Sequence, residues 1–126
     1  MQKPSDTRWS DSRTEPDILS EQRDGDIVEL ELFADAELFQ FKGHFPGEPV
    51  LPGVAQLDWA ARFARQYFGF QGSFSKMGQI KFAKLVRADR TLLLRLEWGR
   101  DKGRITFSFR DDGELCSSGY FELAGR

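Results

Sequence analysis

PGVAQLDWAARFARQYFG, residues 52–69, is a segment with two adjacent apolar stripes at helical spacing. The first stripe consists of Val54, Leu57, Ala61, Ala64 and Phe68, and the second of Trp59, Phe63 and Tyr67. Pro52 suits the first turn of a helix, where a missing N–H costs nothing, and Gly69 is a typical helix end. A helix that is apolar around so much of its circumference is expected to be covered by other elements. The segment therefore predicts one long, buried, central helix.

Strand-like segments lie on both sides of this predicted helix in the sequence. They are residues 27–32, 76–86, 91–98, 104–110 and 114–123. Turn-forming residues at 99–103 and 111–113 indicate that the last three strands are joined as hairpins. The order of elements predicts an α+β fold in which one antiparallel sheet wraps a single helix. Because residues 1–16 are polar and lack apolar periodicity, we expect them to form a flexible arm and residues 17–126 to form one domain.

The composition excludes several classes of protein. A chain of 126 residues with 40% hydrophobic and 30% charged residues is typical of one soluble domain. The single cysteine, Cys116, excludes an intrachain disulfide and a cysteine-based zinc site, and the single histidine, His44, excludes a histidine-rich metal centre. No window offers the roughly 18 apolar residues of a membrane helix, and the polar N-terminus lacks the apolar core of a signal peptide. We therefore expect a cytoplasmic protein without a metal site or a membrane span.

The eleven residues before the predicted helix, 43–53, have the sequence GHFPGEPVLPG. They contain three of the five prolines and three of the twelve glycines, which predicts a loop with one well-defined backbone conformation. His44 lies in this loop, and histidine is the side chain best suited to accept a proton near neutral pH. A single histidine is more often structural, but a rigid loop provides the fixed geometry that a general base requires. His44 is therefore the candidate general base.

Two further candidates lie at the start of the predicted helix. Asp58 is flanked by Leu57 and Trp59, and a carboxylate among apolar residues is costly unless it is paired or protonated. The alternative role for Asp58 is an ion pair with Arg62, four residues later. Gly53 lies in the first turn, where unpaired N–H groups and the helix dipole favour a developing negative charge. The alternative is that Gly53 only begins the helix.

The segment GHFPGEPVLPGVAQLD resembles the active-site motif of FabA/FabZ-type 3-hydroxyacyl-[acyl-carrier-protein] dehydratases, and Asp58 follows His44 by fourteen positions, the separation that this family uses. The run LPGVAQLDW resembles the ApeI-like dehydratases of aryl polyene biosynthesis clusters. The resemblance extends over residues 27–123. It implies a hot-dog fold that forms a homodimer, or a larger assembly of dimers, with an acyl tunnel beside the central helix and no cofactor.

The resemblance also implies a role for each candidate residue. The active site would lie at the dimer interface, where His44 of one subunit would remove the C2 proton of a 3-hydroxyacyl thioester. Asp58 of the other subunit would hold the 3-hydroxyl group and help to protonate it as it leaves, which gives a trans-2-enoyl thioester. The Gly53 N–H would bind the thioester oxygen, and the Val50 carbonyl would accept a hydrogen bond from the second ring nitrogen of His44.

Arg62 departs from the family pattern, because many relatives have glutamine at this place. A guanidinium near Asp58 would favour the ionised carboxylate and weaken it as an acid. The alternatives are that Arg62 points elsewhere or that it helps to bind the substrate.

Charge is divided along the chain, although the net charge is only −2. Residues 1–58 contain 5 Lys/Arg and 13 Asp/Glu, whereas residues 76–104 contain 9 Lys/Arg and 3 Asp/Glu. This division indicates either a set of solvated strand faces or a surface for a charged partner. The resemblance implies an acidic acyl carrier protein as that partner, with Lys81, Lys84 and Arg87 as the candidate contacts. Nucleic-acid binding is disfavoured, because no RNA-binding motif appears and the chain is not basic overall.

Two other functions stay open at this stage. A hot-dog thioesterase would use a carboxylate and a water molecule at the thioester carbon, and it would not require the loop that contains His44. A non-catalytic subunit that binds an acyl carrier protein is favoured by Arg62 beside Asp58, and disfavoured by the presence of both His44 and Asp58.

Overall fold

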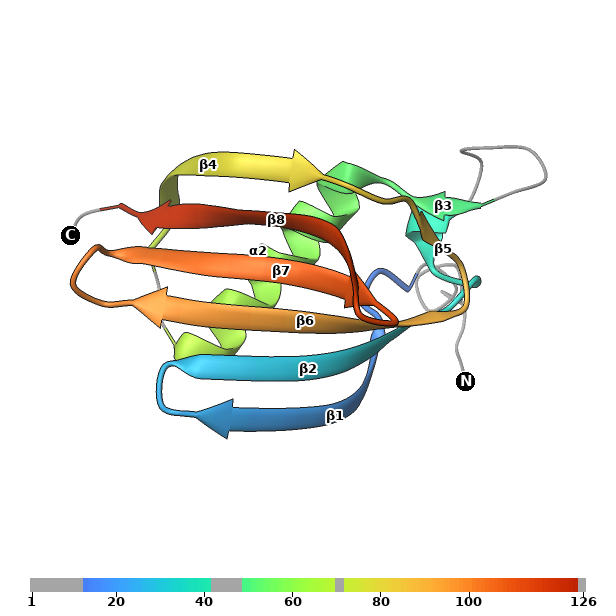
Figure 1. Ribbon diagram of the computed structural model, residues 1–126, viewed down its shortest axis with the longest axis horizontal. Helices are drawn as coiled ribbons and strands as arrows, with labels where there is room; N and C mark the ends of the chain where they lie inside the picture. Colours follow the sequence, from blue (N-terminus) through green and yellow to red (C-terminus); the bar gives the residue numbers. More distant parts are fainter. Residues whose placement is uncertain (1–12, 42–48, 70–71, 125–126) are drawn as a thin grey trace, which may run out of the picture.

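The computed structural model describes residues 13–41, 49–69 and 72–124, which form a six-stranded antiparallel sheet with one long helix across one face (Figure 1). The elements are β1 (Asp17–Asp24), β2 (Ile27–Ala34), the short 3-10 helix η1 (Phe39–Phe41), β3 (Val50–Leu51), α2 (Gly53–Phe68), β4 (Phe74–Phe82), β5 (Val86–Arg87), β6 (Arg90–Gly99), β7 (Arg104–Asp111) and β8 (Glu114–Leu123). The main sheet has the order β1-β2-β6-β7-β8-β4, and β3 pairs with β5. The predicted α+β fold is confirmed. Within the described ranges, no helix is long and apolar enough to cross a membrane.

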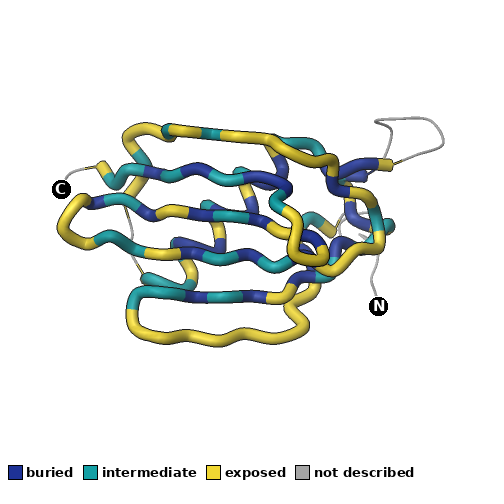
Figure 2. The backbone as a smooth tube through the Cα atoms, in the orientation of Figure 1, coloured by how far each residue is buried: buried dark blue, intermediate teal, exposed yellow. Residues whose placement is uncertain are grey.

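Alternation of apolar and polar residues explains why the central strands pack against α2. On β2, Val28, Leu30 and Leu32 are fully buried on the helix side of the sheet. Glu29 lies between them and forms an ion pair on the opposite face with Arg95 of β6, its partner in the strand register. Figure 2 shows the outcome, with buried residues along the central strands and exposed residues on β1 and β4. The core therefore lies between the middle of the sheet and the helix.

The buried face of α2 differs from the predicted one at its N-terminal end. Trp59 and Phe63, from the second predicted stripe, pack into the core. Val54, from the first stripe, has an exposed fraction of 74%, and Leu57 and Ala61 are only partly buried. The sheet thus covers the second stripe and leaves the N-terminal part of the first stripe open.

β1 is a strand that the sequence pattern does not predict. Its sequence DILSEQRD lacks apolar alternation, and every residue in it is exposed. Backbone pairing with β2 forms the strand, and two contacts tie it to the end of α2. The Tyr67 hydroxyl donates to Glu21 at 2.8 Å, and Arg23 donates to the Tyr67 carbonyl at 2.5 Å. Burial, together with the hydrogen bond to Glu21, raises the pKa of Tyr67 to about 12.

The packed part of the chain begins earlier than the predicted domain boundary. The carbonyl of Thr14 accepts hydrogen bonds from the Trp59 indole at 2.8 Å and from the Gln40 side-chain amide at 2.7 Å. The last residues of the predicted arm, 1–16, therefore contact α2 and η1. The first twelve lie outside the described residues.

The predicted strand 76–86 is divided into two strands. β4 ends at Phe82, and β5 leaves the main sheet to pair with β3. The N–H groups of Ala83 and Lys84 both donate to the Cys116 carbonyl, at 2.8 and 3.3 Å, which bends the chain between the two strands. The bend brings β3, and the start of α2 that follows it, beside the end of β4 (Figure 1).

Candidate active site

The turn that joins β3 to α2 carries the first candidate residue, Gly53. Pro52 is extended, with φ −61° and ψ 152°, and its carbonyl accepts the first hydrogen bonds of the helix, from Ala55 at 3.0 Å and Gln56 at 3.3 Å. Gly53 is therefore the first residue of α2, and its N–H belongs to the turn whose amides have no partner within the helix. Because the helix dipole adds partial positive charge here, a polarised oxygen close to this N–H would be stabilised.

A mostly apolar pocket of about 500 Å³ opens beside Gly53. Its lining comes from the start of α2 and from the segment after β4: Leu51, Gly53, Val54, Gln56, Leu57, Phe82, Ala83, Lys84 and Leu85. The Phe82 ring lies directly against the glycine, since a Cβ atom added at residue 53 would be 2.7 Å from the ring atom Cζ. Glycine is therefore what lets another group approach the backbone this closely.

Asp58 lies about one and a half turns along α2 from Gly53. Arg62 Nε is 2.9 Å from Asp58 Oδ2, so the ion pair considered as the alternative role of Asp58 is present, and Arg62 does not point elsewhere. The side chains of Asp58 and Arg62 are 48% and 41% exposed, so the pair contributes at most a few tenths of a kcal/mol, about 0.3–0.5 for this spacing. The same exposure leaves the carboxylate accessible to a substrate or to a second subunit.

Arg62 also contacts the N-terminal segment. Its Nη1 atom lies 3.3 Å from Thr14 Oγ1 and 3.4 Å from Glu15 Oε2. The guanidinium is thus shared between Asp58 on its own helix and two residues from the beginning of the domain. Contacts between residues so far apart in the sequence cannot be inferred from helical spacing.

The other two catalytic candidates belong to the loop before the helix. His44 lies outside the described residues, so its position relative to Asp58 stays a prediction. Val50 is buried in β3 and pairs with Arg87 of β5. The short segment from Val50 to Gly53 therefore connects the β3–β5 pair directly to the first turn of α2.

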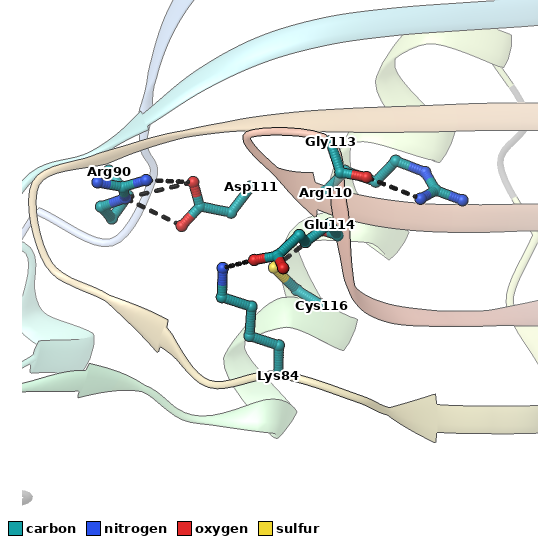
Figure 3. Close-up of polar contacts among 7 residues, drawn as sticks. All are labelled: Lys84, Arg90, Arg110, Asp111, Gly113, Glu114 and Cys116. Atoms are coloured by element: carbon teal, nitrogen blue, oxygen red, sulfur yellow. Dashed lines mark hydrogen bonds and ion pairs between the residues drawn. The ribbon is translucent and has the colours of Figure 1, made fainter.

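The three candidate contacts for a carrier protein have different surroundings. Lys81 lies on β4 opposite Ser118, Lys84 lies in the bend before β5, and Arg87 lies on β5. The ammonium group of Lys84 donates a hydrogen bond to Glu114, which raises the pKa of the lysine (Figure 3). The charge of Lys84 therefore already has a partner within the chain.

A second ion pair lies beside Lys84 (Figure 3). Arg90 binds both carboxylate oxygens of Asp111, with Nε 2.9 Å from Oδ2 and Nη2 2.8 Å from Oδ1. This hydrogen bonding lowers the pKa of the largely buried Asp111. Burial raises the pKa of the nearby Cys116 thiol, which favours its unreactive protonated form. The carbonyl of Cys116 accepts the hydrogen bonds from the Ala83 and Lys84 N–H groups and so holds the backbone from which Lys84 projects.

Gln56 is a residue of the pocket that the sequence analysis missed. It is buried on α2 and accepts a hydrogen bond from Ser117 of β8 at 2.6 Å. The sequence contains one signal for this residue, a polar amide among the apolar residues of the helix. Its partner Ser117, however, is distant in the sequence. Within the described part of the chain, no group of three or more His, Cys, Asp or Glu residues could hold a metal ion.

Comparison with solved structures defines the class of the fold. The chain is similar to zebrafish thioesterase superfamily member 2, with 18% identity and a TM-score of 0.62, over 88% of this chain and 82% of that one. At this identity the similarity shows the fold alone, which is the predicted hot-dog fold.

A narrower assignment comes from the family model of the ApeI-like proteins, described as ApeI dehydratase, which matches residues 20–120. The chain belongs to this ApeI-like dehydratase family. It is similar to a chain of the dehydratase heterocomplex ApeI:P from Xenorhabdus doucetiae, with 33% identity and a TM-score of 0.82, over 86% of this chain and 97% of that one. It is also 38% identical over 72 residues to the 3-hydroxyacyl-[acyl-carrier-protein] dehydratase FabZ of Caldicellulosiruptor saccharolyticus. That match covers 52% of this chain and 51% of the relative, so the chain spans about half the length of this curated protein.

Proposed function

We propose that this protein is a 3-hydroxyacyl-[acyl-carrier-protein] dehydratase, which eliminates water from a 3-hydroxyacyl thioester and forms a trans-2-enoyl thioester in fatty acid or aryl polyene biosynthesis. The observation that carries the proposal is the start of α2, where an apolar pocket opens beside the Gly53 amide and the accessible carboxylate of Asp58 lies farther along the same helix. Membership of the ApeI-like family and similarity to a FabZ dehydratase support the same reaction class.

The proposed reaction uses one base and one oxyanion-binding amide. His44 takes a proton from C2, and the charge that develops on the thioester oxygen is stabilised by the Gly53 N–H. The C2=C3 double bond forms as the C3–O bond breaks, and the departing hydroxide takes a proton and leaves as water. The Val50 carbonyl accepts a hydrogen bond from the second ring nitrogen of His44 and so leaves the first nitrogen free to act as the base. The elimination needs no redox cofactor, because the substrate undergoes no net oxidation or reduction.

The ion pair with Arg62 supports a hydrogen-bond-accepting role for Asp58. Arg62 Nε lies 2.9 Å from Asp58 Oδ2, so the guanidinium donates to this carboxylate and leaves the other oxygen to accept from a substrate. It can accept a hydrogen bond from the 3-hydroxyl group and hold the C3–O bond in the orientation for elimination. The proton that the leaving hydroxide needs then comes from His44, which has taken one from C2. The reaction therefore needs no second acid, because the proton that His44 removes from C2 is returned to the leaving hydroxide.

Hydration of a 2-enoyl N-acetylcysteamine thioester, the reverse reaction, tests the proposed function. We expect the wild-type protein to remove the absorbance of the conjugated enoyl group without releasing free thiol. A thioesterase would instead release the thiol. A non-catalytic carrier-binding subunit would do neither, and this second candidate is favoured by the Asp58–Arg62 pair and by the heterocomplex that the similar Xenorhabdus doucetiae chain forms.

We propose that a second copy of the chain covers the open face between α2 and β4. Among the residues that the structure describes, β4 is a terminal strand of the sheet and is paired with β8 on one side only. Phe82 is 53% exposed and lines the same pocket as Val54 and Leu85, which are exposed as well. An exposed apolar patch beside a free strand edge is typical of a protein–protein interface. In such a homodimer, the family resemblance implies that His44 of one subunit acts with Asp58 of the other.

Phe82→Asp should convert the dimer into a monomer, because it would place a carboxylate in the apolar centre of the proposed interface. Size-exclusion chromatography with light scattering measures the mass. The matched control is Ile18→Asp, which changes an exposed apolar residue on β1, at the opposite edge of the sheet, and should leave the dimer intact. A dimeric Phe82→Asp variant would contradict the proposed interface. A monomeric wild-type protein that pairs only with a second hot-dog chain would contradict the homodimer.

We propose that an acidic acyl carrier protein docks at Lys81, Lys84 and Arg87. Lys84 lines the pocket beside Gly53, so a carrier bound here could deliver its acyl arm to that pocket. Opposite charge at the rim of such an interface favours the correct partner.

Arg87→Glu should raise KM for a carrier-bound substrate by about three- to tenfold, because rim charges affect mainly encounter with the partner. KM for the N-acetylcysteamine thioester should stay unchanged, since this substrate lacks the carrier. The control is Lys102→Glu, in the β6–β7 turn at the far end of the sheet. An equal rise of KM for both substrates would contradict the docking surface.

A further inference from the structure

Gln56 joins three elements at the start of α2. Its side chain is 3% exposed, and Ser117 on β8 is fully buried. The Ser117 hydroxyl donates to Gln56 Oε1 at 2.6 Å, and Gln56 Nε2 donates to the Leu51 carbonyl at 3.3 Å. One amide thus connects the helix, the main sheet and the last residue of β3.

These hydrogen bonds allow only one orientation of the amide. If the Gln56 side chain were flipped, its oxygen would face the Leu51 carbonyl, and two acceptors would meet without a proton between them. A buried amide or hydroxyl without a partner costs about 1–3 kcal/mol, so both groups are strongly held where they are. The position of the Leu51 carbonyl is therefore specified by side chains from two other elements.

Leu51 is separated from Gly53 by a single residue, Pro52. β3 is only two residues long, so its pairing with β5 provides few hydrogen bonds to hold it. The ring of Pro52 fixes its φ, which limits how far Gly53 can move relative to Leu51. The Val50 carbonyl belongs to the planar peptide group that joins Val50 to Leu51. A contact that holds Leu51 therefore restricts both the Val50 carbonyl and the Gly53 N–H.

We propose that Gln56, supported by Ser117, is a positioning residue for dehydration. It holds the β3–α2 turn so that the Gly53 N–H stays aligned with the thioester oxygen of the substrate. The inference rests on the proposed function. It assigns Gln56 no contact with the reacting atoms.

Gln56→Leu tests the proposal, because leucine has a similar size but cannot hold the Leu51 carbonyl. We expect kcat for the N-acetylcysteamine thioester to fall by about 10- to 100-fold, since a shift of an ångström in a catalytic group has an effect of this order. KM should change by less than about twofold, because the apolar lining of the pocket is retained. The melting temperature should also fall, since the Ser117 hydroxyl is left unpaired.

The double variant Gln56→Leu/Ser117→Ala separates positioning from stability. It removes the unpaired hydroxyl, so the melting temperature should recover toward that of the wild type, while kcat should stay low. Recovery of kcat to within about twofold of the wild type in the folded double variant would overturn the inference and leave the proposed function intact. A wild-type protein that forms no product would instead overturn the proposed function itself.

Discussion

His44→Ala should lower kcat for dehydration by about 10²- to 10⁴-fold, the range that a general base contributes. His44 is the only histidine in the chain, so no second imidazole can take over the proton transfer. Formation of the enoyl thioester by purified wild-type and variant proteins, at equal concentration, measures the effect. The melting temperature and the affinity for the acyl carrier protein should remain close to the wild-type values, because the proposal gives His44 no role in packing or docking.

Two results would contradict this role for His44. A variant that keeps more than about a tenth of the wild-type kcat would show that another group removes the C2 proton. An inactive variant that has also lost its fold or its carrier affinity would point to a structural histidine, which is the commoner role of a single histidine in a chain.

Asp58→Ala should lower kcat by about 10²- to 10³-fold, because the 3-hydroxyl group loses the carboxylate that orients it. Asp58→Asn should be less impaired than Asp58→Ala, because an amide oxygen still accepts a hydrogen bond from the hydroxyl. This order follows from the proposed role, in which Asp58, paired with Arg62, accepts a hydrogen bond from the hydroxyl and does not donate a proton. Initial rates with saturating substrate measure both variants.

Glu15→Gln is the matched control for these two variants. Glu15 is the other carboxylate that Arg62 contacts, at 3.4 Å, and the proposed mechanism gives it no contact with the substrate. We expect kcat of this variant to stay within about threefold of the wild type, because the lost ion pair is exposed. Equal losses in Glu15→Gln and Asp58→Ala would mean that the charge network around Arg62, and not the Asp58 carboxylate, supports catalysis.

The parts of the fold that the sequence predicts are those with a local signal. α2 is predicted almost to the residue, because a Pro-Gly pair begins it and Gly69 ends it with φ 72°. β8 is predicted with its observed limits, because the Asp111-Asp112-Gly113 turn marks its start. β1 is not predicted, because a strand exposed on both faces has no apolar alternation to mark it. The break between β4 and β5 depends on the distant Cys116 carbonyl.

The candidate site shows the same division between local and distant contacts. The Asp58–Arg62 pair is foreseeable from a spacing of four residues on a helix. The contacts of Arg62 with Thr14 and Glu15 are not foreseeable, because the N-terminal segment has no pattern that predicts its packing. Gln56 was missed for a similar reason, since only the fold brings Ser117 to it.

The most direct test of the proposed dehydration is mass spectrometry of a 3-hydroxyacyl carrier protein after incubation with the wild-type protein. We predict that the intact acylated carrier loses the mass of one water molecule, and that Asp58→Ala leaves the substrate unchanged under the same conditions. A carrier that loses its whole acyl group would contradict the account in favour of a thioesterase. A carrier that binds the wild-type protein but keeps its mass would show a non-catalytic subunit.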